Sequence, residues 1–300
     1  MEEFICFLSD NAIDYILNAE MSQFTTIKIG GKADVLVQPS NIDQLKKIIK
    51  IANQLNVKIT FIGNGSNILV RDKGVRGAVI KFGKNFAEYS VCDEIIEVLS
   101  GISMAKIASI AAEHSLEGFE FASGIPGTIG GGIVMNAGAY KGELADVVFE
   151  VDALCADGEI RTFDKEHLDF SYRHSCFTGT DMLVLSAKIK LKKGDKNEIV
   201  ARINELSQKR RKTQPLEYPS AGSAFKRPEI GYAAAMIDEC GLKGFSVGGA
   251  EVSTKHAGFV VNKGGATAKD VADLLNAVKE RVYAQFGVML EPEIVTIGEE

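Results

Sequence analysis

Apolar residues recur at helical spacing in some segments of the chain and run together as in strands in others. Between residues 45 and 55 they repeat every three or four positions, after Ser40-Asn41-Ile42-Asp43, which resembles a capping box at the start of a helix. The apolar run at residues 58–62 predicts a short strand, and the glycines after it predict a tight turn. This part of the pattern predicts an α/β unit that ends in a loop.

The same two patterns continue to the end of the chain, without an internal repeat of fixed period. We expect the residues before position 40 to form a polar N-terminal stretch. We predict further strands over residues 68–70, 78–80, 95–99, 147–155, 160–163, 183–191, 245–252 and 259–261. We predict further helices over residues 104–112, 197–212, 232–240 and 271–282. The mixture indicates a protein that contains both helices and sheets.

Composition narrows the class of protein. A chain of 300 residues with 46% hydrophobic and 25% charged residues is globular in character and long enough for about two domains. Its formal net charge of −6 argues against a general nucleic-acid binder, because phosphates are neutralised by a basic face. It has no apolar run of about 18 residues and no basic residue before Lys28, so we expect no membrane span, no secretory signal and a cytoplasmic location.

Cysteine and histidine spacing gives no sign of a metal site. The 5 cysteines are scattered without a C-x-x-C pair, and the 4 histidines show no paired spacing. We therefore expect reduced thiols and no metal.

Two glycine-rich segments, residues 63–67 and 123–132, are the unusual part of the chain. Neither matches the dinucleotide fingerprint G-x-G-x-x-G or the phosphate loop of nucleoside triphosphatases. By itself the first is better interpreted as a plain turn, whereas five glycines in ten positions favour a ligand lying against the second. Together they suggest one elongated anionic cofactor.

Seven short motifs occur in order at residues 25–31 (TTIKIGG), 63–67 (GNGSN), 124–131 (GIPGTIGG), 135–140 (MNAGAY), 172–175 (YRHS), 220–226 (SAGSAFK) and 290–293 (LEPE). This ordered set resembles the FAD-binding region of vanillyl-alcohol-oxidase-type flavoproteins and, more narrowly, the UDP-N-acetylenolpyruvoylglucosamine reductase family. The resemblance implies an α+β fold with a two-lobed FAD-binding region and an α/β substrate-binding domain. The expected parts are residues 1–85 with 288–300, residues 86–195, and residues 196–287.

The resemblance also implies an activity: hydride passes from NADPH to non-covalent FAD and then to the enolpyruvyl group of UDP-N-acetylglucosamine enolpyruvate, giving UDP-N-acetylmuramate. Hydride addition places negative charge beside a carboxylate, so such a site needs charge stabilisers and a proton donor. By resemblance Arg173 stabilises that charge, Ser223 donates the proton, and Glu293 holds or polarises the same intermediate. Alone, each would be interpreted as an ordinary surface or loop residue.

Further residues are assigned by the same resemblance. Tyr172 and Lys226 are expected to contact the substrate. The expected FAD contacts are Gly63, Asn64, Gly65, Ser66, Asn67, Ser123, Gly124, Ile125, Gly127, Gly130, Gly131, Ile133 and Gly138.

The sequence departs from the family pattern in three places, one of which is Lys141, where a glycine is frequent. The insertion of longer members that carries a substrate-capping tyrosine is missing after Ser175, and Arg227 stands where those members have an asparagine, which puts a uridine contact in doubt. We expect a monomer that takes a small nucleotide sugar and binds neither nucleic acid nor membrane.

Two alternatives remain. An oxidase of another sugar or hydroxy acid on the same fold is disfavoured, because it would need a base in place of a proton-donating serine. A non-catalytic flavin or nucleotide-sugar binding protein would bind FAD and lose nothing on replacement of Ser223.

Overall fold

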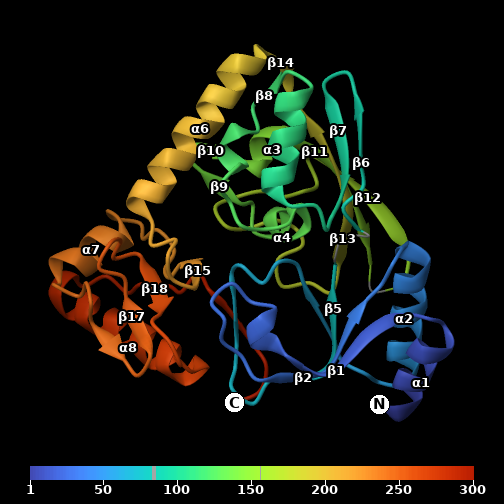
Figure 1. Ribbon diagram of the computed structural model, residues 1–300, viewed down its shortest axis with the longest axis horizontal. Coiled ribbons are helices and arrows are strands. Elements are labelled where there is room, and N and C mark those ends of the chain that lie inside the picture. Colours follow the sequence, from blue (N-terminus) through green and yellow to red (C-terminus); the bar gives the residue numbers. More distant parts are fainter. Residues whose placement is uncertain (83–85, 156) are drawn as a thin grey trace. The chain divides into compact units, whose positions relative to one another are not determined.

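The computed structural model describes residues 1–82, 86–155 and 157–300 (Figure 1). The predicted boundary at residue 85 lies outside the described residues. The helices are α1 (Glu2–Asp10), α2 (Ile42–Gln54), α3 (Met104–Glu113), α4 (Ile129–Val134), α5 (Leu144–Val147), α6 (Lys196–Thr213), α7 (Ala233–Glu239) and α8 (Ala268–Phe286), with short 3-10 turns η1 (Met21–Gln23) and η3 (Glu120–Ala122). Among the described residues, no helix combines the length and the apolar character needed to cross a membrane.

Contacts within the chain divide it into two compact units. Unit 1 comprises Met1–Tyr15, Val37–Gly63 and Ile80–Arg210, and unit 2 comprises Ile16–Leu36, Asn64–Val79 and Arg211–Glu300. The three-part division expected from the sequence groups the chain differently and stays a prediction.

The first two helices differ in whether the sequence predicted them. Asn41 accepts a hydrogen bond from the Gln44 backbone at 2.9 Å, and the Gln44 side chain accepts one from the Ser40 backbone at 2.8 Å. Helix α2 therefore starts where predicted, but Asn41 and Gln44 form the cap in place of the expected Ser40 and Asp43.

The expectation of a polar N-terminal stretch was wrong: helix α1 and the strands over Asp14–Glu20 and Lys32–Gln38 were not predicted. Phe4 and Leu8, one helical turn apart, are fully buried, and α1 packs on α2.

One sheet holds four strands near the start of the chain, and a second forms the centre of unit 1. The first has the order β1 (Asp14–Glu20), β2 (Lys32–Gln38), β5 (Val75–Lys81) and β3 (Ile59–Ile62). The second is antiparallel, in the order β12 (Ile160–Asp164), β11 (Val148–Leu154), β13 (Leu183–Lys190), β7 (Ile95–Leu99) and β6 (Tyr89–Cys92). Short pairs accompany it: β8 (Leu116–Glu117) with β14 (Lys192–Lys193), and β9 (Gly138–Ala139) with β10 (Gly142–Glu143).

Helix α4 corrects the expectation that residues 123–132 form one glycine-rich loop. Residues 129–134 are helical and pack on β13. A Cβ on Gly132 would lie 3.0 Å from Leu144 and 3.1 Å from the Met104 sulfur. Glycine therefore lets α4 approach its neighbours closely, and this packing outweighs the poor helix propensity of glycine.

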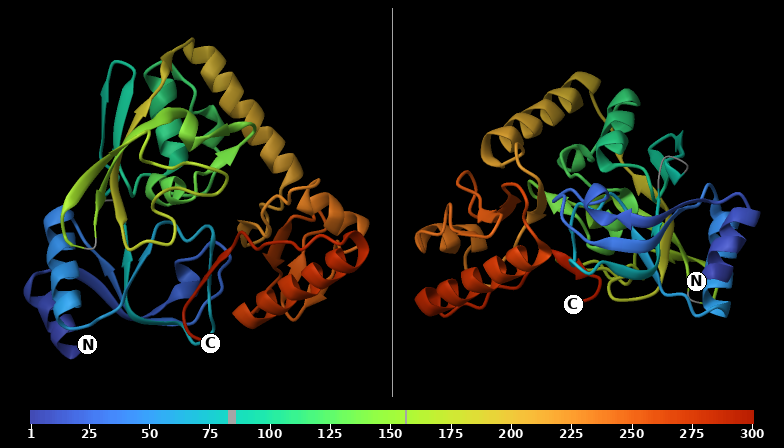
Figure 2. Two further views of the ribbon diagram at one scale, coloured as in Figure 1. Left: turned by 180° about the vertical axis from the view of Figure 1, so that it is seen from behind. Right: turned by 60° about the horizontal axis from the view of Figure 1, so that its bottom comes forward.

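Unit 2 has its own sheet and core. The sheet order is β15 (Ser220–Ser223), β18 (Phe259–Asn262), β17 (Ala250–Val252) and β16 (Ser246–Val247), and α8 packs along β16 and β17 (Figure 2). Val271, Leu274 and Val278, at helical spacing, are fully buried in this core. A parallel pair, β4 (Ile68–Val70) with β19 (Val295–Ile297), brings the chain end into the same unit.

Candidate active site

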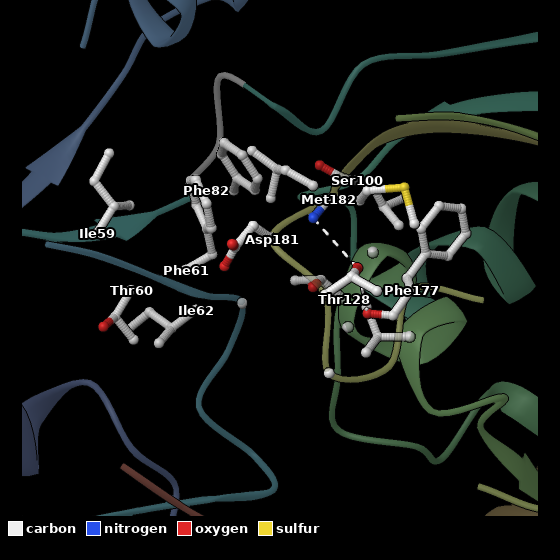
Figure 3. Close-up of a pocket in the computed structure, with 18 residues that line it drawn as sticks. Ile59, Thr60, Phe61, Ile62, Phe82, Ser100, Thr128, Phe177, Asp181 and Met182 are labelled. Carbon is white, nitrogen blue, oxygen red and sulfur yellow. Dashed lines mark hydrogen bonds between the residues drawn. The ribbon is translucent and has the colours of Figure 1, made fainter. Parts of the chain in front are cut away.

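A cavity of about 320 Å³ lies within unit 1, and we call it the glycine cavity. Its walls come from β3 and Gly63, from Ser100 after β7, from Thr128 with the glycines of α4, and from residues 177–184 (Figure 3). The two glycine-rich segments of the sequence thus meet at one cavity, at Gly63 on one side and Gly130 and Gly131 on the other.

The glycines of this cavity are required for different reasons. A Cβ on Gly63 would collide with the Thr128 hydroxyl, and one on Gly130 would lie 2.8 Å from the Ser100 Cβ. Gly131 also lines the cavity, but a Cβ there would have its nearest neighbour, the Thr128 hydroxyl, 3.9 Å away. The first two glycines allow the protein to pack, whereas Gly131 leaves free space that a ligand could fill.

Both polar and apolar groups surround the cavity. Ser100 is 1% exposed, and its hydroxyl has no hydrogen-bond partner among the described residues. Lys81 donates to the Gly63 carbonyl at 3.2 Å, and burial lowers the pKa of this lysine. The free space at Gly131, together with the apolar side chains that make up most of the lining, fits part of a bound cofactor such as FAD.

Arg173 occupies the tip of a tight turn in unit 1. Ser171 and His174 exchange backbone hydrogen bonds of 3.2 and 3.1 Å, and Arg173 adopts a left-handed backbone with φ of 56°. Buried Asn136, from the MNAGAY motif, donates to the Ser171 carbonyl at 3.0 Å and accepts from Ala145 at 3.0 Å. Asn136 therefore holds the base of the turn that presents Arg173.

Ser223 and Glu293, far apart in the sequence, are brought together in unit 2. Phe225 pairs with Pro292 in an antiparallel bridge, and the Glu293 backbone donates to the Ala224 carbonyl at 3.0 Å. Glu293 is half-buried, and Asn67 donates to its carbonyl at 3.1 Å. Backbone pairing alone thus brings together the two segments that carry the predicted proton donor and the predicted polarising carboxylate.

The loop formed by residues 64–67 belongs to the same part of unit 2. The Gly65 carbonyl accepts from the Thr26 backbone at 3.1 Å, and the Thr26 hydroxyl donates to the Ser220 carbonyl at 2.7 Å. A Cβ on Gly65 would collide with the Phe24 carbonyl, which explains the glycine. Four of the seven motifs, at residues 25–31, 63–67, 220–226 and 290–293, contact one another here.

The predicted substrate contacts are already engaged with other side chains. The Lys226 ammonium pairs with Glu291 at 2.5 Å, and its backbone donates to the Glu291 carbonyl at 2.8 Å. Tyr172 is 50% exposed, with the Arg173 guanidinium 4.9 Å from its ring centre. Arg227, the departure from the longer members, lies 4.4 Å from the ring centre of Tyr232.

The predicted FAD contacts fall into three groups. Gly63, Gly130 and Gly131 line the glycine cavity. The others in unit 1 lie outside the lining of that cavity as the structure describes it: Ser123, Gly124, Ile125, Gly127, Ile133 and Gly138. Asn64, Gly65, Ser66 and Asn67 belong to unit 2.

Sequence reasoning missed several residues of the cavity. Ser100 and Thr128 carry hydroxyls in its wall, and neither stood out in the sequence beyond the position of Thr128 inside a glycine-rich motif. Residues 177–184, where the capping-tyrosine insertion is missing, also contribute to the lining.

Arg210, near the end of α6, belongs to the basic run of residues 209–212, which the sequence alone did not assign to the site. A Cβ on Gly124 would lie 2.9 Å from the Arg210 side chain, and burial lowers the pKa of this arginine. Its side chain is therefore a half-buried positive charge beside the second glycine-rich segment. Among the described residues, no cluster of histidine, cysteine and carboxylate side chains is suited to holding a metal ion.

Comparisons with known proteins agree with these motifs. Residues 33–164 match the family described as FAD binding domain, and residues 214–297 match the family described as UDP-N-acetylenolpyruvoylglucosamine reductase, C-terminal domain. The UDP-N-acetylenolpyruvoylglucosamine reductase of Agathobacter rectalis is 49% identical over 291 residues, covering 93% of this chain and 92% of that protein. The one of Syntrophomonas wolfei is 45% identical over 284 residues, covering 95% of both.

Solved structures give the same picture. The crystal structure of UDP-N-acetylenolpyruvylglucosamine reductase from Thermus caldophilus has a TM-score of 0.81 and 35% identity, covering 95% of this chain and 99% of that one. A berberine bridge enzyme variant has a TM-score of 0.51 at 17% identity, covering 64% of this chain and 44% of its own. The second likeness shows a shared fold only.

Proposed function

The chain belongs to the UDP-N-acetylenolpyruvoylglucosamine reductase family, and on this premise we propose that it reduces UDP-N-acetylglucosamine enolpyruvate to UDP-N-acetylmuramate in peptidoglycan precursor synthesis. FAD and NADPH serve as its cofactors. The observation that carries the proposal is the pairing of the segments that hold Ser223 and Glu293, beside the loop of residues 64–67.

Bound FAD would supply hydride transfer from NADPH to the substrate. The protein's own task is to stabilise the charge and deliver one proton. Hydride addition to the terminal vinyl carbon leaves a carbanion beside the substrate carboxylate, and the Arg173 guanidinium suits that delocalised charge, because its planar fork of donors matches a carboxylate.

Ser223 then gives its hydroxyl proton to the carbon next to the carboxylate. A serine hydroxyl is a weak acid, so this transfer requires a strongly basic acceptor, and the carbanion is one. Glu293 orients or polarises the same group from the neighbouring segment. Electrons and atoms balance: the double bond gains one hydride and one proton.

Tyr172 and Lys226 are proposed substrate contacts. The compact positive charge of the Lys226 ammonium would bind the substrate diphosphate. To do so, it would give up part of its ion pair with Glu291. Both NADPH and a UDP-sugar carry multiple charges and do not cross membranes unaided, so the reaction belongs in the cytoplasm. We propose that the protein is a monomer. Size-exclusion chromatography with light scattering tests this proposal.

The test follows the visible flavin absorbance of the anaerobic protein. We expect NADPH to bleach the flavin band, and UDP-N-acetylglucosamine enolpyruvate to restore it. Bleaching without recovery would overturn the substrate while keeping a flavoprotein. Bleaching by a different sugar or hydroxy acid, followed by recovery with oxygen, would favour an oxidase. The absence of a flavin signal after FAD is added would favour a non-catalytic binding protein.

A further inference from the structure

Val134 is the last residue of helix α4, and its carbonyl accepts two side-chain hydrogen bonds. The Ser175 hydroxyl donates to it at 2.9 Å, and the Thr178 hydroxyl donates to it at 2.7 Å. The last carbonyls of a helix have no partner within the helix itself. Two hydroxyls from one short segment therefore satisfy the end of α4, and they tie that segment to the helix.

Ser175 makes further bonds that fix its position. It is fully buried, its hydroxyl also accepts from the Phe177 backbone at 3.3 Å, and its own N–H donates to the Thr178 hydroxyl at 3.1 Å. The Thr178 backbone donates to the Ser175 carbonyl at 2.9 Å. Ser175 and Thr178 thus form a closed turn whose two hydroxyls donate to one helix carbonyl.

The residues just before this closed turn include Arg173. Ser171 and His174 exchange backbone hydrogen bonds around Arg173, and Asn136, which follows α4, donates to the Ser171 carbonyl at 3.0 Å. The turn that carries Arg173 is therefore attached to the end of α4 on both sides, through Ser171 before it and through Ser175 after it.

The backbone of Arg173 needs such support. Its φ of 56° is a left-handed conformation that is unfavourable for residues other than glycine and persists only where the surrounding structure imposes it. Helix α4 is a firm support, because Gly130 donates to the Ser100 carbonyl at 3.0 Å and the helix packs on β13. Loss of one attachment would let the turn relax and would displace the guanidinium.

We propose that Ser175, together with Thr178, is a positioning residue that places the Arg173 guanidinium for the substrate by fixing its turn to α4. This inference rests on the proposed function, in which Arg173 stabilises the charge left by hydride addition. Neither hydroxyl takes part in the chemistry, because each donates its single proton to the Val134 carbonyl. The helix that lines the glycine cavity thus also carries the turn that stabilises charge.

The test is a double-mutant cycle in the full-length protein loaded with FAD. Stopped-flow absorbance measures anaerobic flavin reoxidation by saturating UDP-N-acetylglucosamine enolpyruvate in wild type, Ser175→Ala, Arg173→Ala and the variant with both changes. We expect Arg173→Ala to slow reoxidation about 100- to 1,000-fold, and Ser175→Ala to slow it about 10- to 100-fold. With Arg173 already replaced, Ser175→Ala should change the rate by less than about twofold, because a residue that acts through Arg173 has nothing left to position. Flavin reduction by NADPH should stay close to wild type in Ser175→Ala.

A second variant keeps the test open if Ser175→Ala folds poorly. Thr178 is exposed, and Thr178→Val removes its hydroxyl while keeping the shape of the side chain. This change should slow reoxidation less than Ser175→Ala does, because the Ser175 hydroxyl still holds the Val134 carbonyl. Its effect should also disappear when Arg173 is replaced.

The matched control is Ser186→Ala. Ser186 lies in β13, and its hydroxyl donates to Asp152 at 2.8 Å. Its replacement should lower the thermal midpoint, as Ser175→Ala does, and should leave both half-reactions close to wild type.

Three outcomes would overturn the inference: wild-type reoxidation in both Ser175→Ala and Thr178→Val, slowing by the same factor with and without Arg173, or equal slowing of flavin reduction by NADPH. Wild-type flavin that NADPH reduces and the enolpyruvyl substrate fails to reoxidise would instead contradict the proposed function, so the two failures are distinguishable.

Discussion

In unit 1, the wall of the glycine cavity includes Gly131, which has open space beside it. In unit 2, Ser223 and Glu293 lie on segments whose backbones pair with each other. The first arrangement leaves room for a ligand, whereas the second is set by the chain alone. The difference indicates that cofactor binding and proton delivery place different demands on the fold, and that substitutions can separate them.

The largest expected effect comes from removing the proposed proton donor of unit 2. Ser223→Ala should slow flavin reoxidation by the enolpyruvyl substrate about a thousandfold, because a positioned proton donor contributes about 100- to 10,000-fold. Flavin reduction by NADPH should stay nearly unchanged. Stopped-flow absorbance measures each half-reaction separately.

Ser220→Ala is the matched control, because Ser220 lies in the same strand and uses its carbonyl to accept from Thr26. It should leave both half-reactions close to wild type. Equal slowing of reduction and reoxidation in Ser223→Ala would contradict the assigned role.

The next effect concerns the turn that carries Arg173. Asn136→Ala removes a fully buried amide that bonds to Ser171 and Ala145, and should reduce the free energy of unfolding by about 2 kcal/mol. It should also slow substrate-dependent reoxidation by displacing the turn. Chemical denaturation and stopped-flow absorbance measure the two effects.

Asn136 has φ of 42°, so part of the loss would come from the backbone. Asn18→Ala controls for this, because exposed Asn18 has φ of 49° and no place in the proposed site. It should cost about 1 kcal/mol or less. Equal losses in the two variants would show that the buried amide adds nothing.

A pair of glycine substitutions sharpens the contrast inside the cavity. Gly131→Ala has room in the protein, so the flavin-free chain should keep its stability while FAD affinity falls about tenfold, or about 1.4 kcal/mol. Gly130→Ala places a Cβ 2.8 Å from that of Ser100 and should itself destabilise the chain by about 1–3 kcal/mol. Thermal unfolding and FAD titration measure both. Tight FAD binding by Gly131→Ala would show that no ligand approaches this backbone.

The smallest effect is a pH dependence in unit 2. Burial lowers the pKa of His256, whose Nδ1 accepts from Gly258 at 3.1 Å, and the Gly258 carbonyl accepts from Ala224 beside Ser223. The folded state favours the neutral ring, so stability should fall as pH drops below about 6.5, where the unfolded chain binds the proton first. Thermal midpoints across pH should show a smaller fall in His256→Phe.

The contribution of His167, in unit 1, to stability should change with pH in the opposite direction. Its hydrogen bond to Asp164 raises the pKa of this histidine, so its contribution is present at low pH and is lost as pH rises through the folded pKa. Both groups are exposed, which makes the contribution small. A wild-type profile that matches His256→Phe at low pH would contradict the role of His256.

Local sequence patterns determined most helices and strands. The start of α2 followed from Ser40 and Asn41, and α8 followed from its helical apolar spacing, because capping and periodicity depend on residues a few positions apart. The ordered motifs also identified the family, since each is a short string of residues. Helix α1 was missed, because its two buried side chains gain their meaning only by packing against α2.

Tertiary structure decided the contacts between residues far apart in the sequence, which short sequence motifs do not specify. Three glycines of residues 129–134 are helical, and at Gly130 and Gly132 close packing of neighbouring side chains outweighs the poor helix propensity of glycine. Ser100 looked like any serine until folding buried its hydroxyl without a partner, and the segments that carry Ser223 and Glu293 became neighbours only when their backbones paired. The sequence determined the elements and the chemical groups through local forces, while long-range packing decided which of those groups meet.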